Sequence, residues 1–138
     1  MKRLAAALLL TLLAATLTTP VAARDTRLLL PIADALEQGH EQGVIDKDML
    51  FRFGKGNRGG VSKTFGSDVA NRKTNALNKT DIQACNWVFL TALKALQEGA
   101  RKSNGNAVVE IVSYYKKNEF SSATEFECHA GGIMAGVA

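Results

Sequence analysis

The clearest pattern of apolar and polar positions begins at Thr80. After it, apolar side chains recur at spacings of three and four residues, as on one face of an α-helix. They are Cys85, Phe89, Ala92, Leu93, Leu96 and Ala100. Thr80 and Gln83 have the spacing of a capping box, and Asp81 suits the positively polarised start of a helix. Asn104 and Gly105 are typical of a helix end, so we predict one long amphipathic helix between Thr80 and Asn104.

Two segments after this helix have the composition of β-strands. Residues 107–115 are rich in β-branched and aromatic side chains, and residues 123–130 alternate between apolar and polar side chains. This alternation predicts one buried face and one wet face. The buried set is Thr124, Phe126, Cys128 and Ala130, and the wet set is Glu125, Glu127 and His129. The polar residues 116–119 indicate a turn, so that the second strand returns beside the first.

The first half of the chain carries weaker signals. Residues 28–38 indicate a strand or turn that leads into a short helix, with Pro31 in the first helical turn, where its missing N–H costs nothing. Residues 49–53 are a short strand candidate, and residues 54–60 are a flexible glycine-rich loop or hairpin tip. Residues 61–69 are expected to return as a second strand.

These elements predict the α+β class. The order strand, strand, helix, strand, strand (ββαββ) is most simply a small antiparallel sheet with one main helix packed on one face. A short N-terminal helical segment precedes it. We divide the chain into a signal peptide (residues 1–23), the N-terminal helical segment (24–46) and a single α+β domain (47–138).

The N-terminus has the pattern of a secretory signal peptide. Lys2 and Arg3 precede an apolar run at 4–17, and small residues at 21–23 precede the charged Arg24. The apolar run is shorter than the ~20 residues of a membrane span, and an uncleaved N-terminal anchor is the alternative. We expect cleavage near Arg24 and a soluble periplasmic product with no transmembrane segment.

Charge narrows the possible partners. The 138-residue chain has a net charge of +4, and removing the two charges of Lys2 and Arg3 leaves +2. Between residues 52 and 79 the one acid is Asp68, and the bases are Arg52, Lys55, Arg58, Lys63, Arg72, Lys73 and Lys79. This basic region favours an anionic envelope surface as a partner or, alternatively, is a solvated loop. Nucleic acid is not an expected partner, because aromatic and basic residues do not alternate.

The two cysteines make a structural prediction. Cys85 lies on the apolar stripe of the helix, and Cys128 lies on the apolar face of the last long strand. If the helix packs on the sheet, both sulfurs point into the same layer. An even cysteine count in a small exported domain favours a disulfide. Two separately buried free thiols are the alternative.

We predict no catalytic, cofactor-binding or metal-binding residue. Residues 54–64 are similar to a phosphate-binding loop, but Ser62 precedes Lys63 where that loop has glycine, and no helix is expected there. His129 adjoins Cys128 but points to the opposite face of the strand, and no tetrahedral ligand set is visible. The chain therefore implies no cofactor and no metal.

Four blocks of the chain resemble a known family. They are residues 73–79 (KTNALNK), 84–90 (ACNWVFL), 105–115 (GNAVVEIVSYY) and 123–131 (ATEFECHAG). Together they are similar to small exported proteobacterial proteins of unknown function that often carry the label "excinuclease ATPase subunit". The label implies a DNA-repair ATPase, but the chain has no phosphate-binding loop, so we interpret the label as a misnomer.

A more distant resemblance covers the start of the 105–115 block and the strand of Cys128. Both are similar to the Rcs envelope-stress sensor lipoprotein and to YbjQ-type domains, which have a helix packed on a small sheet. The resemblance implies that Cys85 and Cys128 match one disulfide of the sensor family. The chain lacks that family's lipid-anchor cysteine, proline-rich linker and second cysteine pair.

Three hypotheses for function remain. The first is a periplasmic, non-enzymatic binding or sensing module with an unknown ligand and an envelope partner. The second is an enzyme that acts on envelope material through a site around His129, Glu127 and Tyr115. The third is a structural protein that self-associates through its strand edges. A concave pocket of polar groups from several elements would favour the enzyme, and a flat or groove-like face would favour the module.

Overall fold

The computed structural model describes residues 24–132 and 134–138, and the expected signal peptide lies outside this part. The elements are β1 (Thr26–Pro31), α1 (Ile32–Glu41), β2 (Leu50–Phe53), β3 (Arg72–Asn75), α2 (Asp81–Lys102), β4 (Ala107–Ile111), the 3₁₀ turn η1 (Tyr115–Lys117), β5 (Glu125–Ala130) and β6 (Met134–Val137). The mixture of helices and strands confirms the α+β class.

The long helix α2 has the boundaries that its local sequence predicts. The hydroxyl of Thr80 accepts a hydrogen bond from the backbone N–H of Gln83 at 3.1 Å, and the Gln83 side chain accepts one from the backbone N–H of Thr80 at 3.0 Å. These two bonds are the capping box, which satisfies N–H groups that a helix start leaves free. Asn104, with φ 58°, lies just beyond the end of the helix.

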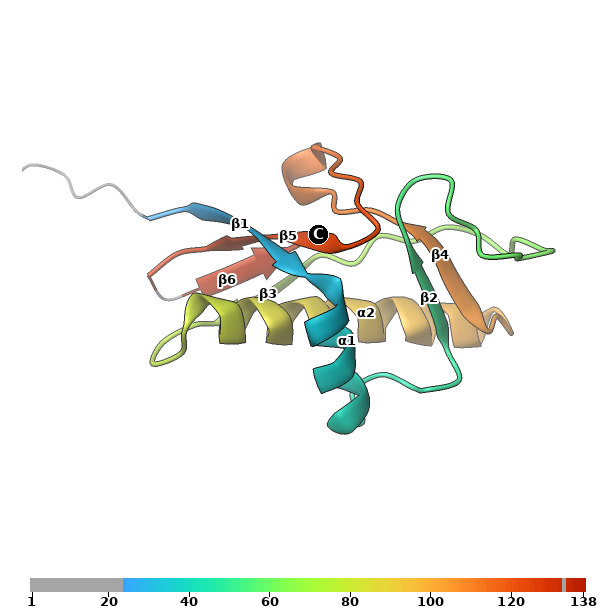
Figure 1. The fold of residues 1–138 in the computed structure, drawn as a ribbon, viewed down its shortest axis with the longest axis horizontal. Helices are drawn as coiled ribbons and strands as arrows, with labels where there is room; N and C mark the ends of the chain where they lie inside the picture. Colours follow the sequence, from blue (N-terminus) through green and yellow to red (C-terminus); the bar gives the residue numbers. More distant parts are fainter. Residues whose placement is uncertain (1–23, 133) are drawn as a thin grey trace, which may run out of the picture.

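The strands form two sheets on this helix. The order of the first sheet is β1-β5-β6-β3, all antiparallel, and β2 and β4 form a two-stranded parallel sheet. The four-stranded sheet covers the N-terminal half of α2, and the two-stranded sheet lies at its C-terminal half (Figure 1). The helix therefore carries both sheets.

The prediction of one antiparallel sheet was wrong in its pairing. The strand β4 does not pair with β5. The connection from β4 to β5 contains only one isolated bridge, between Ser113 and Phe120. This connection crosses the outer face of the four-stranded sheet, where the ring of Tyr115 stacks on His129. The strand β4 lies in the second sheet, beside β2.

The second strand in the first half also differs from the prediction. Residues 61–69 form no strand, and the strand is instead β3, which begins at Arg72. Since β3 is a largely exposed edge strand, it lacks the apolar alternation on which the prediction relied. Its partner β6 was not predicted, because a short run containing Gly136 carries a weak strand signal.

Aromatic rings join the two sheets through α2. Phe126 of β5 stacks on Phe89 of α2 with ring centroids 3.9 Å apart, and the Phe89 centroid lies 6.0 Å from that of Phe53 in β2. Leu30 of β1 and Ile32 of α1 are buried in the same core. The described residues therefore pack around one shared core, to which the N-terminal segment contributes.

Candidate functional site

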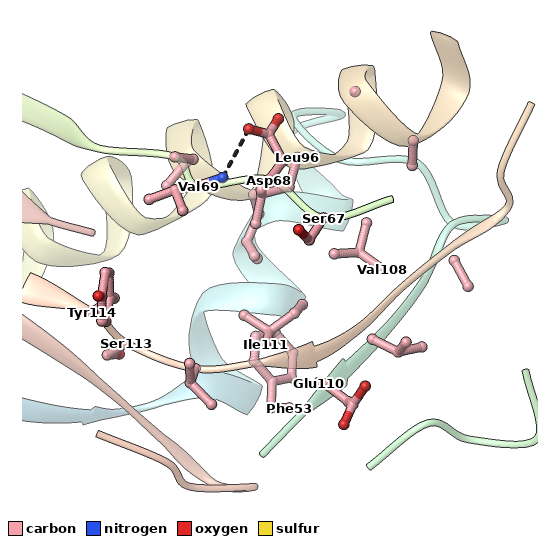
Figure 2. Close-up of a pocket in the computed structure, with 18 of the residues that line it drawn as sticks. Phe53, Ser67, Asp68, Val69, Leu96, Val108, Glu110, Ile111, Ser113 and Tyr114 are labelled. Atoms are coloured by element: carbon pink, nitrogen blue, oxygen red, sulfur yellow. Dashed lines mark hydrogen bonds between the residues drawn. The ribbon is translucent and has the colours of Figure 1, made fainter. Parts of the chain in front are cut away.

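A mostly apolar cavity lies between α2, β4 and the extended segment of residues 61–70 (Figure 2). Its volume is about 650 Å³, within the range of roughly 300–1,000 Å³ that is usual for ligand sites. The lining residues on and just after α2 recur every three or four positions. They are Phe89, Ala92, Leu93, Leu96, Gly99, Ala100 and Ser103. The C-terminal half of the helix stripe thus forms one wall of the cavity.

The second wall is β4 together with β2. Figure 2 shows Val108 and Ile111 of β4 with Phe53 of β2 on this side of the cavity. Every residue from 105 to 114 lines it. Because side chains of a strand alternate between two faces, an unbroken run of lining residues means that the edge of β4 also borders the cavity.

The third wall is the segment of residues 61–70. In the described chain, residues 62–71 make no backbone–backbone hydrogen bond. Phe65 and Val69 are 55% and 65% exposed. Asp68 accepts a hydrogen bond from the backbone N–H of Val69 at 2.8 Å, the bond dashed in Figure 2. This wall is therefore held by few polar contacts with the rest of the fold.

Glu110 fixes the glycine-rich loop at one end of the cavity. Its carboxylate accepts a hydrogen bond from the backbone N–H of Gly56 at 3.0 Å and pairs with Nη1 of Arg58 at 2.7 Å. Glu110 has φ 54°, a conformation that non-glycine residues adopt rarely and that often occurs at functional sites. Residues 54–60 are therefore a loop organised by specific contacts. No helix begins after Lys63, so this region does not have the geometry of a phosphate-binding loop.

The face of β5 that was predicted to be wet is covered at Glu127 and His129. Glu127 is 6% exposed, and Arg27 of β1 donates through Nε to its carboxylate. Nδ1 of His129 lies 3.1 Å from Oδ1 of Asp25. Glu125 is exposed, as predicted. The prediction of a wet face was wrong for Glu127 and His129, because the connection that carries Tyr115 packs over this part of the strand.

This covered cluster brings together the three residues of the enzyme hypothesis. The ring centroids of Tyr115 and His129 lie 3.7 Å apart, and Nε2 of His129 lies 3.2 Å from Oε2 of Glu127 without forming a hydrogen bond. The adjoining cavity has a volume of only about 270 Å³. Since Arg27 already neutralises Glu127, the arrangement offers paired charges rather than a free general base facing a substrate site.

The two cysteines lie together in the core. Their Sγ atoms are 2.09 Å apart, which is bonding distance, and their Cα atoms are 5.9 Å apart. Cys85 in the N-terminal half of α2 and Cys128 in β5 are both fully buried. Neither lines the large cavity, so the pair has a structural rather than a ligand-binding position.

The basic region between residues 52 and 79 is partly neutralised. Arg58 pairs with Glu110, and Nζ of Lys55 lies 3.9 Å from Glu119. The remaining bases form no ion pair in the described part of the chain: Arg52, Lys63, Arg72, Lys73 and Lys79. An anionic envelope surface as a partner stays a prediction.

The large cavity was not predicted from the sequence. The stripe that ends in Leu96 and Ala100 was interpreted as core, although the last turns of α2 face a cavity as well. One feature of the sequence indicated such a cavity. The apolar stripe extends along the whole helix, whereas the strand candidates are too short to cover all of it. Nothing in residues 61–70 marks them as a cavity wall.

Among residues 24–132 and 134–138, no three His, Cys, Asp or Glu side chains gather in a way that could hold a metal ion. None of the helices in this part is both long and apolar enough to cross a membrane. No protein-family model, curated protein or solved structure gives a significant match to the chain.

Proposed function

We propose that the protein is an exported, non-enzymatic binding module of the cell envelope whose ligand occupies the cavity between α2, β4 and residues 61–70. The observation that carries this proposal is the cavity itself, with its volume of about 650 Å³ and mostly apolar walls from three parts of the chain. Concave apolar sites with few polar groups are the usual form of small-ligand and segment-binding sites.

Export to the periplasm is the second part of the proposal. It is supported by the signal-peptide pattern of residues 1–23 and by the Cys85–Cys128 pair. Disulfides persist in oxidising compartments and are rare in the cytosol. A sensing role would require that ligand binding change a contact with an envelope partner.

An enzyme that acts on envelope material is the second candidate. It is favoured by the buried Nε2 of His129, which makes no hydrogen bond. It is disfavoured by the ring of Tyr115 stacked on His129 and by the pairing of Glu127 with Arg27. Hydrolysis of an envelope polymer or lipid that His129→Gln abolishes would support this candidate instead.

The binding proposal is tested with the neutral apolar fluorophore Nile red and the full chain. We expect saturable binding that Gly99→Leu abolishes, because the new side chain would enter the cavity from α2. A Cβ atom at position 99 would contact only Oδ2 of Asp68, at 3.2 Å. Leucine also has a higher helix propensity than glycine, so the variant is expected to fold.

The matched control is Ile82→Ser, which removes a 57% exposed apolar side chain at the other end of α2. It should leave Nile red binding unchanged. Equal binding by Gly99→Leu and the native chain would show that the cavity is not the site.

A further inference from the structure

We infer that the ligand of this cavity is an extended peptide segment that adds as a strand to the free edge of β4. The inference rests on the proposed function and names the class of its ligand. It follows from the backbone of β4, the length of β4 and the charge at the cavity.

The backbone of β4 has a free edge. The C=O of Asn106 accepts a hydrogen bond from β2 at 3.1 Å, and the N–H of Glu110 donates to Asn57, just after β2, at 3.1 Å. Because alternate residues of a strand point their backbone groups in opposite directions, Ala107 points its groups away from β2. Val109 lies where the β2–β4 register shifts, between the pairs Phe51–Val108 and Phe53–Ile111, and has no partner residue in β2. In the described chain these two residues make no backbone hydrogen bond outside the β2–β4 ladder.

These backbone groups distinguish a peptide from an acyl chain. An acyl chain would fill the apolar part of the cavity but would remove the N–H and C=O groups of Ala107 and Val109 from water without pairing them. An unpaired buried polar group costs free energy comparable to a lost hydrogen bond. An added strand pairs the same groups and places alternate side chains in the apolar part of the cavity, as in β-strand addition to sheet edges.

The length of β4 fits such a strand. β4 runs from Ala107 to Ile111 and has five residues, which span roughly 17 Å. An extended peptide of about six residues spans roughly 20 Å. Since side chains of a strand alternate, about three of the six would face the stripe that contains Leu93 and Leu96.

Charge at the cavity favours a basic residue in the peptide. Asp68 lines the cavity beside Gly99 and forms no ion pair in the described chain. Glu125 also lines the cavity and forms no ion pair in the described chain. The one unpaired cation of the lining, Lys63, lies 5.1 Å over the ring of Phe65. We therefore expect a lysine or arginine of the ligand beside Asp68.

The probe is a capped, fluorescently labelled hexapeptide of alternating valine and threonine with a lysine at one end, titrated into the full chain by fluorescence anisotropy. We expect saturable binding that Gly99→Leu abolishes. A matched peptide that is N-methylated at alternate residues should bind at least about tenfold more weakly, because it cannot donate to the β4 edge.

The charge requirement has its own control. Replacing the lysine of the peptide with glutamate should weaken binding up to about fivefold, and Asp68→Lys should reverse this preference. Asp68 is exposed, so this variant is expected to fold.

The outcomes separate the inference from the proposed function. If the N-methylated peptide binds as tightly as its parent, or if laurate displaces Nile red while the hexapeptide does not, the peptide inference is wrong and the binding module stands. If neither Nile red nor the hexapeptide binds, the proposed function fails as well.

Discussion

Arg24 and Asp81 form a bidentate ion pair at the start of α2. Nη1 of Arg24 donates to Oδ2 of Asp81 at 2.8 Å, and Nη2 donates to Oδ1 at 3.0 Å. These hydrogen bonds, assisted by the positive charge of Arg24, hold the pKa of Asp81 below its ordinary value. Because the folded-state pKa is lowered, the stabilisation is present above the ordinary carboxyl pKa of about 3.9. It is lost as the pH falls through the folded-state value.

We expect Asp81→Asn to lower the urea midpoint of unfolding at about pH 7 and to have a smaller effect at about pH 2, because pH 2 lies below the ordinary carboxyl pKa and the stabilisation falls as the pH drops below that value. The matched control is Asp34→Asn, an acid in the first turn of α1 that forms no ion pair in the described chain. It should have the smaller effect at neutral pH. An effect of Asp81→Asn that is equal at both pH values would contradict the role of the ion pair.

At the scale of elements, the turn η1 holds two lysines in the left-handed conformation. Lys116 has φ 50° and Lys117 has φ 62°. This conformation costs a non-glycine residue roughly 1–2 kcal/mol, and glycine adopts it freely. Part of the stability gained by introducing glycine is offset, because glycine has a larger conformational entropy in the unfolded chain. We expect Lys117→Gly to stabilise the protein by about 0.5 kcal/mol in urea unfolding.

A second lysine-to-glycine substitution provides the control. Lys94 is exposed in the middle of α2, where glycine should destabilise by about 1 kcal/mol. If Lys117→Gly destabilises the protein as Lys94→Gly does, residue 117 does not carry the strain assigned to it.

The elements that could be predicted from the sequence are those with local signals. The helix α2 was predicted because its cap at Thr80, its stripe and its end at Asn104 all lie within one stretch of chain. The pairing of β4 with β2 was not, because it depends on contacts between segments more than 50 residues apart, such as Leu50 with Ala107. The cavity was not predicted either, because its walls are distant in sequence and no residue type marks them.

At the scale of the whole molecule, the Cys85–Cys128 pair joins the helix that carries both sheets to the central part of the larger sheet. The two positions are separated by 43 residues. A bond that closes a loop of this length stabilises by about 4 kcal/mol in the chain-entropy model. The pair lies at the N-terminal half of α2, whereas the cavity lies along its C-terminal half. Stability and binding should therefore respond differently when the bond is removed.

We expect the double variant Cys85→Ala/Cys128→Ala to unfold at a much lower urea concentration than the native chain, with a loss of about 3–4 kcal/mol. While it is folded, it should bind Nile red as the native chain does, because neither cysteine lines the cavity. A reducing agent should destabilise the native chain and leave the double variant unchanged. Two alkylatable thiols in the unreduced, denatured native protein would show that the bond does not form. A parallel loss of Nile red binding in the folded variant would instead show that the pair also shapes the cavity, through the part of α2 that the two regions share.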